Sequence, residues 1–236
     1  MDLTSATAIV TGASSGIGAA LSRTLSSAGA RVLLAARRID RLEETAARCP
    51  GETLVVKADV TDEADRKELV RRATDSWGRL DLLVNNAGVG AYGEFGSSTE
   101  AGWRHLFDVN LFAAVTLTRE ALPLLLDAEG GVVVNVASIG GLLAHGEGLA
   151  AYVASKHALV GFSRALARDL AGSGVRVIAA CPHLTDTELF GTGEGAEAMT
   201  DAVARYRSRM DSPEAVAQGI VDQLDSERVV VFPTSR

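Results

Sequence analysis

Thr11-Gly12-Ala13-Ser14-Ser15-Gly16-Ile17-Gly18 is the stretch that decides the fold. It follows the apolar run Ala6–Val10 and leads into apolar residues at three- and four-residue steps, which predict a helix. At such a junction glycines permit a tight turn, close approach of the backbone to a pyrophosphate, and close packing of helix on strand. The alternative is a tight turn without a ligand, but the position at the first strand–helix junction favours a dinucleotide site. The residues expected to bind the dinucleotide are Gly12, Ser14, Ser15, Gly16, Ile17 and Gly18.

The rest of the chain continues this alternation of short apolar runs and longer helical patterns. Nearly continuous apolar runs are typical of strands that are buried on both faces of a parallel sheet. Such runs are Ala6–Val10, Arg31–Ala35, Thr53–Ala58, Leu80–Val84, Gly131–Ala137, Val175–Ala179 and Val229–Phe232. Alternating strands and helices predict βαβ units with right-handed crossovers. We therefore expect an α/β fold: a Rossmann-like, doubly wound, seven-stranded parallel sheet with helices on both faces, in a single domain over residues 1–236.

Capping residues and glycines mark the ends of several elements. Ser97 followed by Glu100 matches a capping box and predicts the start of a long helix. Ser212-Pro213-Glu214 predicts the N-cap and first turn of the last helix. The segment at about 184–210 contains glycines but little periodic pattern. Because long glycine-bearing segments inside compact domains are often functional, we expect a lid that covers the substrate here.

The composition limits the class of protein. With 236 residues, 47% of them hydrophobic, the chain can bury a large core without disulfides or a structural metal. The formal net charge of −7 argues against general affinity for nucleic acid or an anionic membrane. The chain lacks an uninterrupted apolar run of about 18 residues, so we expect no spanning helix. Cys49 and Cys181 lack metal-ligand spacing, which predicts free thiols, no metal site and a cytoplasmic protein.

Tyr152 and Lys156 stand four residues apart at the start of a helical pattern, so their side chains lie on one helix face. A tyrosine with a pKa of about 10 exchanges protons poorly at neutral pH. A neighbouring ammonium favours the phenolate and is expected to lower the pKa of Tyr152 toward the working range. Such a pair alone is more often a solvated helix face, but the glycine-rich turn upstream favours acid–base catalysis.

Three motifs together resemble those of the short-chain dehydrogenase/reductase family. They are the Thr-Gly-x-x-x-Gly-x-Gly pattern of residues 11–18, then Asn85-Asn86-Ala87-Gly88 after the fourth expected strand, then Tyr152-x-x-x-Lys156. They occur in the family's order at appropriate separations, and the resemblance runs from about residue 5 to residue 232. It implies an NAD(P)-dependent oxidoreductase with a seven-stranded parallel sheet, which agrees with the strands counted above.

The resemblance also implies roles for individual residues. Ser138 is expected to hydrogen-bond the substrate carbonyl, Tyr152 to transfer the proton, and Lys156 to assist Tyr152 and hold the nicotinamide ribose. Asn110 is expected to anchor a water of the proton relay. The alternatives are a turn-forming Ser138 and an Asn110 that is an ordinary polar helix residue. The cofactor-side residues implied in the same way are Asn86, Ala87, Gly88, Pro182 and Thr187, with Asn85 supporting the sheet.

Two departures from the family's pattern concern the substrate. Ser138 and Tyr152 are separated by one residue more than usual, and Pro182-His183 replaces the family's Pro-Gly. Both segments line the family's pocket, so they leave the substrate's identity open. The residues expected to contact substrate are Tyr92, His145, His183 and Phe190, and the alternative for the two histidines is exposure in loops.

The end of the second strand bears on the choice of nicotinamide cofactor. An acidic side chain there binds the ribose 2′-hydroxyl of NAD, whereas a nearby arginine accommodates the 2′-phosphate of NADP. Here Ala36 occupies the acidic position, and Arg37 and Arg38 follow it. We therefore expect NADP(H) as the preferred cofactor and NAD(H) as the second. Asp59 and Val60, after the third strand, are expected to contact the adenine.

The leading interpretation is an NADP(H)-dependent carbonyl reductase, reversibly an alcohol dehydrogenase, acting on a small-molecule ketone or alcohol. Two alternatives are a catalytically silent NADP(H)-binding regulator and an epimerase or dehydratase of the same family. The helical patterns over residues 103–126 and 152–170 carry apolar residues on more than one stripe. One stripe can cover the sheet and another a second subunit. With the family resemblance, this predicts a homo-tetramer, and a dimer as the second possibility.

Overall fold

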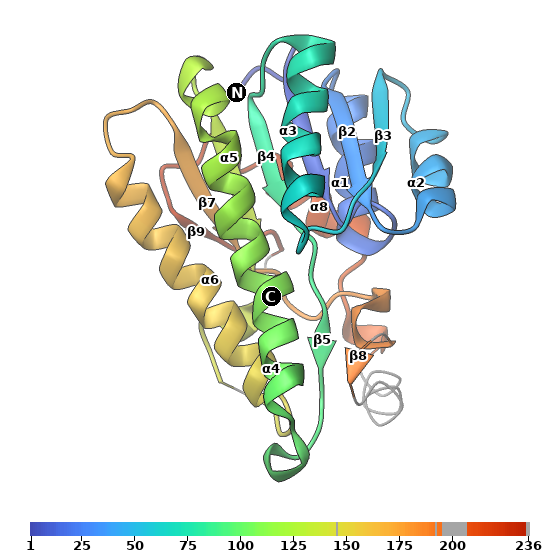
Figure 1. The fold of residues 1–236 in the computed structure, drawn as a ribbon, viewed down its shortest axis with the longest axis vertical. Coiled ribbons are helices and arrows are strands. Elements are labelled where there is room, and N and C mark those ends of the chain that lie inside the picture. The colour runs from blue at the N-terminus through green and yellow to red at the C-terminus, as the bar shows by residue number, and fades with distance from the viewer. Residues whose placement is uncertain (145, 192, 195–206, 235–236) are drawn as a thin grey trace.

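A seven-stranded parallel sheet forms the centre of the computed structural model, which describes residues 1–144, 146–191, 193–194 and 207–234 (Figure 1). In spatial order its strands are β3 (Thr53–Lys57), β2 (Arg31–Ala36), β1 (Thr7–Thr11), β4 (Leu82–Asn85), β6 (Val132–Val136), β7 (Arg176–Ala180) and β9 (Val230–Val231). Each lies within a residue or two of an expected strand. The predicted doubly wound sheet is therefore confirmed.

Helices cover both faces of this sheet. On one face lie α1 (Gly16–Ser27), α2 (Ile39–Ala46) and α8 (Pro213–Val221), and on the other α3 (Glu63–Trp77), α5 (Ala113–Asp127) and α6 (Ala150–Asp169). Alternate residues of each central strand point to opposite layers, so Val10 packs under α1 while Ile9 packs under α3 and α5. Full burial of each such aliphatic side chain contributes about 1.5–3 kcal/mol.

The chain changes direction across the sheet between β1 and β4. β1 pairs with β2 on one side, Thr7 opposite Arg31, and with β4 on the other, Ala8 opposite Leu82. The connections after β1 and β4 therefore diverge to opposite faces and leave a crevice at the carboxyl ends of the strands, where ligands bind in such folds. This topology brings residues 11–18 and 85–88 to the same crevice.

A buried polar network fastens the centre of the sheet to the helices beneath it. The Asn85 Nδ2 atom donates to Thr118 Oγ1 at 2.9 Å and to Asn135 Oδ1 at 2.8 Å. Asn135 Nδ2 in turn donates to Ser163 Oγ at 2.9 Å. These bonds join β4 and β6 to α5 and α6. In the dry interior each unmade bond would leave a costly unpaired group, so the network fixes the relative positions of these elements. The expected support of the sheet by Asn85 is seen here.

The long helix expected after residue 97 begins two residues later and is not regular. Thr99 caps α4 (Glu100–Phe107), its Oγ1 accepting from Gly102 N at 3.0 Å. The prediction of a Ser97 cap was wrong because Ser97 lies in a 3₁₀ turn, where its hydroxyl donates to Glu94 O at 2.9 Å. A π-helical turn at Asp108–Phe112 then joins α4 to α5. Such turns are rare and frequently lie at functional sites.

The continuous helical run Glu100–Asp127 meets the length and hydropathy of a membrane-spanning helix, because its most apolar 18-residue stretch has a mean hydropathy of 1.4. Sequence inspection missed it because charged residues interrupt the apolar run. Core helices of soluble proteins meet the same criteria, and here Leu117, Ala121 and Leu125 are buried against the sheet. The apolar side chains on this face are those of a helix that covers a sheet.

A second, two-stranded sheet lies beyond the crevice. β5 (Gly90–Ala91) pairs in parallel with β8 (Gly193–Glu194), and neither strand was expected. β8 belongs to the expected lid, as do the 3₁₀ turns Glu188–Gly191 and Arg207–Arg209. Residues 192 and 195–206 of that segment lie outside the described residues. The predicted start of α8 is confirmed, since Ser212 Oγ accepts from Ala215 N at 3.2 Å.

Candidate active site

A cavity of about 1190 Å³ runs along the carboxyl edge of the sheet. The turns after β1, β2 and β3 line one end of it. The segments after β4, β6 and β7, together with the start of α6, line the other end. The topology thus gathers into one space segments that are far apart in the sequence.

The glycine-rich turn is bound tightly to the segment after β4. Thr11 Oγ1 accepts from the backbone N–H groups of Asn86 at 3.0 Å and Ala87 at 3.1 Å. Asn86 Nδ2 donates back to Thr11 O at 2.9 Å. A Cβ added at Gly18 would lie 2.3 Å from Gly12 O, so only glycine allows α1 to start this close to the turn. Gly12 has a φ of +66°, which favours glycine there as well.

The end of the cavity near β2 and β3 carries both arginines that were expected to bind cofactor. Ala36 ends β2 and is buried, while Arg37 and Arg38 are exposed and line the cavity. Asp59 and Val60 line it from the end of β3. Burial acts to raise the pKa of Asp59, but hydrogen bonds from Thr61 and the charge of Arg37 outweigh it, so this pKa is lowered. The Asp59 carboxylate is therefore ionised beside Arg37 at neutral pH.

At the other end, Ser138, Tyr152 and Lys156 line the same cavity. Ser138 caps the 3₁₀ turn Ile139–Gly141, and its Oγ accepts from Gly140 N at 3.0 Å. Lys156 Nζ donates to Val136 O at 3.0 Å and lies 5.9 Å from the centroid of the Tyr152 ring. The predicted serine, tyrosine and lysine are therefore brought together at the end of β6.

Asn110 lies in the π-helical turn and is buried. Its Oδ1 accepts from Val89 N at 2.8 Å, and its Nδ2 donates to Val89 O at 3.0 Å and Ser155 Oγ at 3.1 Å. A Cβ added at Gly88 would lie 3.3 Å from Asn110 Oδ1 and 3.6 Å from Lys156 Nζ. The Asn110 side chain thus holds the strand-end segment 88–89 against α6, next to Lys156.

Four of the six residues expected to contact substrate or nicotinamide line the cavity, and the other two cannot be placed in it. Tyr92 and His183 line the cavity, as do Pro182 and Thr187. The Thr187 side chain lies over the glycine-rich turn, since a Cβ added at Gly16 would be 3.0 Å from Thr187 Cγ2. His145 lies outside the described residues, and so does the side chain of Phe190.

Comparisons with known proteins agree with this geometry. The family model described as short chain dehydrogenase matches residues 6–197. The chain belongs to the short-chain dehydrogenase family. Rat 15-hydroxyprostaglandin dehydrogenase (NAD(+)) is 33% identical, with 93% of this chain and 86% of that protein covered. Oxidoreductase UcpA of Salmonella typhimurium is 35% identical, with 91% of this chain and 78% of that protein covered.

Solved structures of the family also match. A short-chain dehydrogenase/reductase of Burkholderia phymatum in complex with NAD superposes with a TM-score of 0.91 at 27% identity, covering 99% of this chain and 90% of that one. A short-chain dehydrogenase of Streptomyces avermitilis superposes with a TM-score of 0.85 at 33% identity, covering 98% and 89%. This short-chain dehydrogenase is accordingly an oxidoreductase that uses a pyridine nucleotide cofactor and acts on a small molecule.

The cavity of this short-chain dehydrogenase fits a dinucleotide. It is continuous from Arg37 to Lys156, so a two-ended ligand can reach both ends. The first turn of α1 lies between these ends and offers unpaired N–H groups and the positive end of a helix dipole to a pyrophosphate. A bound pyridine nucleotide would supply or accept a hydride. The glycine-rich turn, the two arginines and Lys156 line the cavity and are the residues that would hold it.

The pKa values of Tyr152 and Lys156 in this short-chain dehydrogenase are shifted mainly by burial. Burial lowers the pKa of Lys156 to about 8. Burial raises the pKa of Tyr152, although a hydrogen bond with Ser138 acts to lower it. The expected lowering by Lys156 was therefore wrong for the protein alone, because removal from water disfavours the phenolate more than its neighbours favour it. Tyr152 is consequently a neutral phenol at neutral pH.

Some residues that shape the site were not recognised from the sequence. Arg66 of α3 donates through Nη1 to Val60 O at 2.8 Å, which fixes the turn after β3. Arg66 Nε also lies 3.7 Å from Glu120 Oε1 of α5 in a largely buried pair. Glu188 and Arg209 line the cavity from the segment expected to be a lid. These residues carry no local motif, so only the tertiary structure reveals them.

Proposed function

We propose that this short-chain dehydrogenase uses NADP(H) to interconvert ketones and secondary alcohols, acting as a carbonyl reductase in the reducing direction. The observation that supports the proposal is the arrangement within one cavity. Ser138, Tyr152 and Lys156 meet at one end, and Arg37 and Arg38 line the other. The first group suits proton transfer to an oxygen atom, and the second suits a phosphate monoester.

The catalytic residues act on the carbonyl oxygen in the proposed reaction. The Ser138 hydroxyl donates a hydrogen bond to this oxygen and polarises the carbonyl. As a hydride from the cofactor reaches the carbonyl carbon, the Tyr152 hydroxyl gives its proton to the developing alkoxide. The charge of Lys156 stabilises the phenolate that remains. Asn110 acts as a positioning residue through its bonds to Val89 and Ser155.

The proposed preference for NADP(H) rests on this chain's own residues at the end of β2. Arg37 is exposed and lines the cavity, and residue 36 contributes only a methyl group. A guanidinium there can bind a 2′-phosphate through charge-assisted, bidentate hydrogen bonds. With Ala at residue 36, this position lacks the carboxylate that would bind the 2′-hydroxyl of NAD(H) and repel a phosphate. NAD(H) is therefore proposed as the second cofactor.

The proposal is tested by mixing the purified enzyme with NADPH or NADH and a panel of aliphatic, aromatic and cyclic ketones. Loss of the reduced nicotinamide absorbance with at least one ketone, faster with NADPH, is expected. Tight binding of NADPH without turnover of any ketone or, in reverse, of any secondary alcohol would favour the silent regulator instead.

The two reaction directions should depend differently on pH. Burial raises the pKa of Tyr152, so the proton needed for reduction is present throughout the neutral range. Oxidation needs the phenolate, so kcat/KM for the alcohol should rise with pH by up to about tenfold per unit. Lys156, with a pKa of about 8, loses its charge above that value, so the rise should flatten there. An oxidation rate that falls between about pH 6 and 8 would contradict this assignment.

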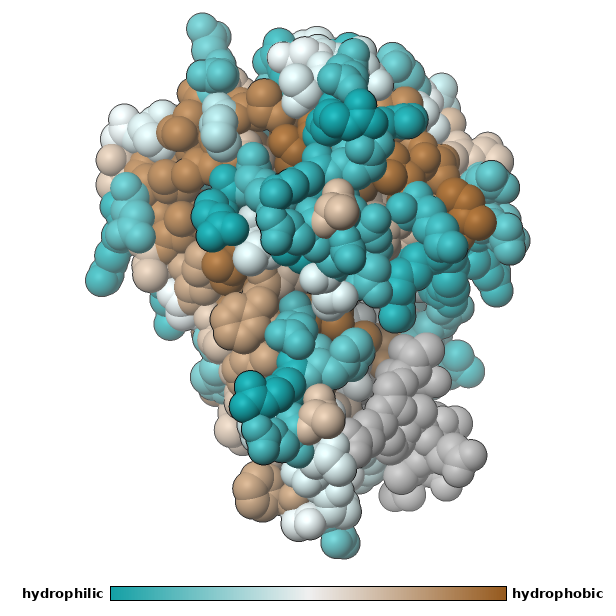
Figure 2. Space-filling model, in the orientation of Figure 1, coloured by the Kyte–Doolittle hydropathy of each residue, from teal (hydrophilic) through white to brown (hydrophobic). Residues whose placement is uncertain are grey.

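We also propose a homo-tetramer, with a dimer as the second possibility. Leu117 covers the sheet, whereas Phe112 on the same helical run has 53% of its surface exposed. Phe162 and Leu166 of α6 are only partly buried. Figure 2 shows apolar surface along the side of the molecule formed by α5 and α6. Exposed apolar surface of this kind favours a subunit interface. Light scattering at micromolar concentration should give four times the mass of the chain, and a monomer would contradict both forms.

A further inference from the structure

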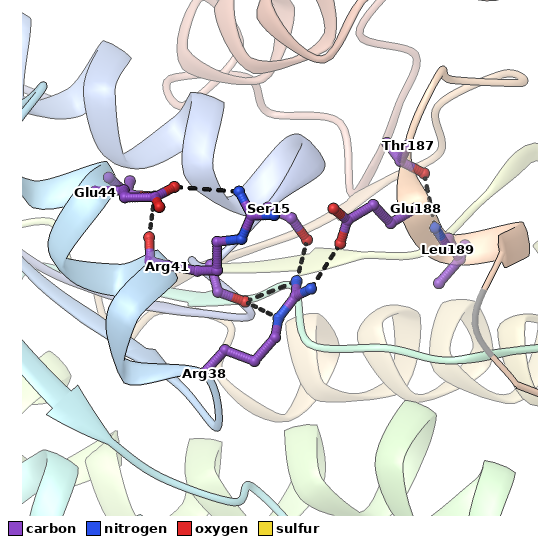
Figure 3. Close-up of polar contacts among 9 residues, drawn as sticks. Ser15, Arg38, Arg41, Glu44, Thr187, Glu188 and Leu189 are labelled. Atoms are coloured by element: carbon purple, nitrogen blue, oxygen red, sulfur yellow. Dashed lines mark hydrogen bonds and ion pairs between the residues drawn. The ribbon is translucent and has the colours of Figure 1, made fainter.

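Arg38 joins the glycine-rich turn to the segment after β7 at the mouth of the cofactor cavity (Figure 3). Its Nη2 atom donates to Ser15 Oγ at 2.8 Å and to Ser14 Oγ at 3.2 Å. Its Nη1 atom donates to Glu188 Oε2 at 2.8 Å. One guanidinium therefore contacts two serines of the proposed phosphate-binding turn and a carboxylate that is 150 residues away in the sequence.

The two kinds of contact divide the guanidinium into an anchored side and an exchangeable side. The serine hydroxyls hold Nη2 from a turn that is itself fixed to β4. Glu188 engages Nη1 from the 3₁₀ turn Glu188–Gly191. The Arg38 and Glu188 side chains are 46% and 48% exposed, so water reaches both. Exposed ion pairs are weak, and a second anion at Nη1 can therefore take the place of the carboxylate.

The position of this pair determines which anion that would be. Arg38 follows Arg37 directly after β2, where the proposed cofactor carries its 2′-phosphate. A phosphate monoester carries more negative charge than a carboxylate at neutral pH, so it attracts the Nη1 donor more strongly. Hydrogen bonds from Arg38 and Ser15 hold the pKa of Glu188 below its usual range, so Glu188 is charged at neutral pH and competes with a phosphate for the Nη1 donor of Arg38.

We propose that Glu188 is a specificity-determining residue, which occupies the Nη1 donor of Arg38 and so reduces the enzyme's selectivity for a 2′-phosphate. This inference rests on the proposed use of NADP(H), because it assumes that the 2′-phosphate binds at the end of β2. With the phosphate bound, Arg38 keeps its serine contacts and exchanges Glu188 for the phosphate. With NAD(H), Glu188 stays in place. The Glu188 carboxylate therefore weakens the binding of NADP(H) and leaves the binding of NAD(H) unchanged.

A neighbouring pair provides a matched control. Arg41 Nη1 bonds Glu44 Oε2 at 3.2 Å on α2, and these side chains are 55% and 56% exposed. Both residues line the groove beside the glycine-rich turn instead of the cofactor cavity. Glu44→Gln removes the same charge from a similarly exposed pair close by. It should therefore reproduce any general effect of net charge without touching the Arg38 contacts.

The experiment measures binding of two adenosine probes to the full chain by calorimetry at low salt. Adenosine 2′,5′-bisphosphate carries the 2′-phosphate, and 5′-AMP lacks it. Glu188→Gln should tighten the bisphosphate by about two- to fivefold, the range that corresponds to an exposed ion pair. Binding of 5′-AMP should not change, and Glu44→Gln should change neither probe. In an Arg38→Met background, Glu188→Gln should no longer tighten the bisphosphate.

The outcomes separate this inference from the proposal on which it rests. Wild type that binds both probes equally would overturn the NADP(H) preference itself. Wild type that prefers the bisphosphate, with Glu188→Gln unchanged or weaker, would overturn the role of Glu188 alone. A Glu188→Gln variant that binds both probes more tightly by the same factor would also overturn the role of Glu188. So would a tightening of the bisphosphate that persists in the Arg38→Met background, because either result would show a general electrostatic effect.

Discussion

Replacing Tyr152 by Phe is expected to lower kcat for ketone reduction by about 10²–10⁴-fold, the usual contribution of a general acid. The substitution removes one hydroxyl from a buried ring and leaves its packing intact. Because that hydroxyl is the proton donor to the alkoxide, the loss should fall on kcat, while the dissociation constant for NADPH stays within about twofold of wild type. Steady-state kinetics and fluorescence titration of the cofactor check both parts.

Tyr92→Phe is the matched control for this prediction. Tyr92 lines the same cavity, and its hydroxyl has no assigned part in proton transfer. The Tyr92→Phe substitution should alter KM for some ketones but leave kcat within about threefold of wild type. A Tyr152→Phe enzyme with near-wild-type kcat, or a Tyr92→Phe enzyme with the larger loss, would show that the proton comes from elsewhere.

Ala36→Asp combined with Arg37→Ala is expected to reverse or erase the preference for NADPH. The new carboxylate repels the 2′-phosphate and can accept from a 2′-hydroxyl, and the second change removes the phosphate's partner. Each charge-assisted hydrogen bond is worth about 1.5–3 kcal/mol. Loss of one such bond should therefore lower the ratio of kcat/KM for NADPH to that for NADH by about 10- to 100-fold. Initial rates with each cofactor at a fixed ketone concentration measure it.

Arg41→Ala is a suitable control, since Arg41 lies on α2 outside the cofactor cavity and should leave the ratio unchanged. A wild-type enzyme that already favours NADH would remove the role given to Arg37. The double variant keeping its full NADPH preference would move the phosphate site elsewhere.

The sheet could be predicted from the sequence because its information is local. The central strands are runs such as Ala6–Val10, and their burial on both faces requires apolar residues throughout. The π-helical turn and the pairing of β5 with β8 could not be predicted. The π-helical turn lies where α4 joins α5 and has no sequence pattern of its own. β5 and β8 are two residues each, and they count as strands only because Gly90 pairs with Gly193 and Ala91 with Glu194. Thr99 was missed as a cap because Ser97 matches the capping box through Glu100, whereas Thr99 has Gly102 three residues later and matches no such pattern.

The candidate site could be proposed from the sequence only where its residues carry motifs. Ser138, Tyr152 and Lys156 were found by spacing and resemblance, and the structure places them in one cavity. The pKa of Tyr152 was predicted in the wrong direction because spacing shows which charges are near and says nothing of burial. The bond from Arg38 to Glu188 joins two exposed residues with no shared pattern, so it is visible only in the folded chain.

Transfer of deuterium tests the central claim most directly. The enzyme is given a ketone that it turns over and NADPH deuterated at C4 of the nicotinamide, once on each face, and the alcohol is analysed by mass spectrometry and NMR. Hydride transfer from the nicotinamide should place one deuterium on the carbinol carbon from one face of the cofactor only, while the hydroxyl proton comes from water through Tyr152. Product formed without deuterium from either face would contradict it, because the enzyme would then act without net hydride transfer, as an epimerase or dehydratase does.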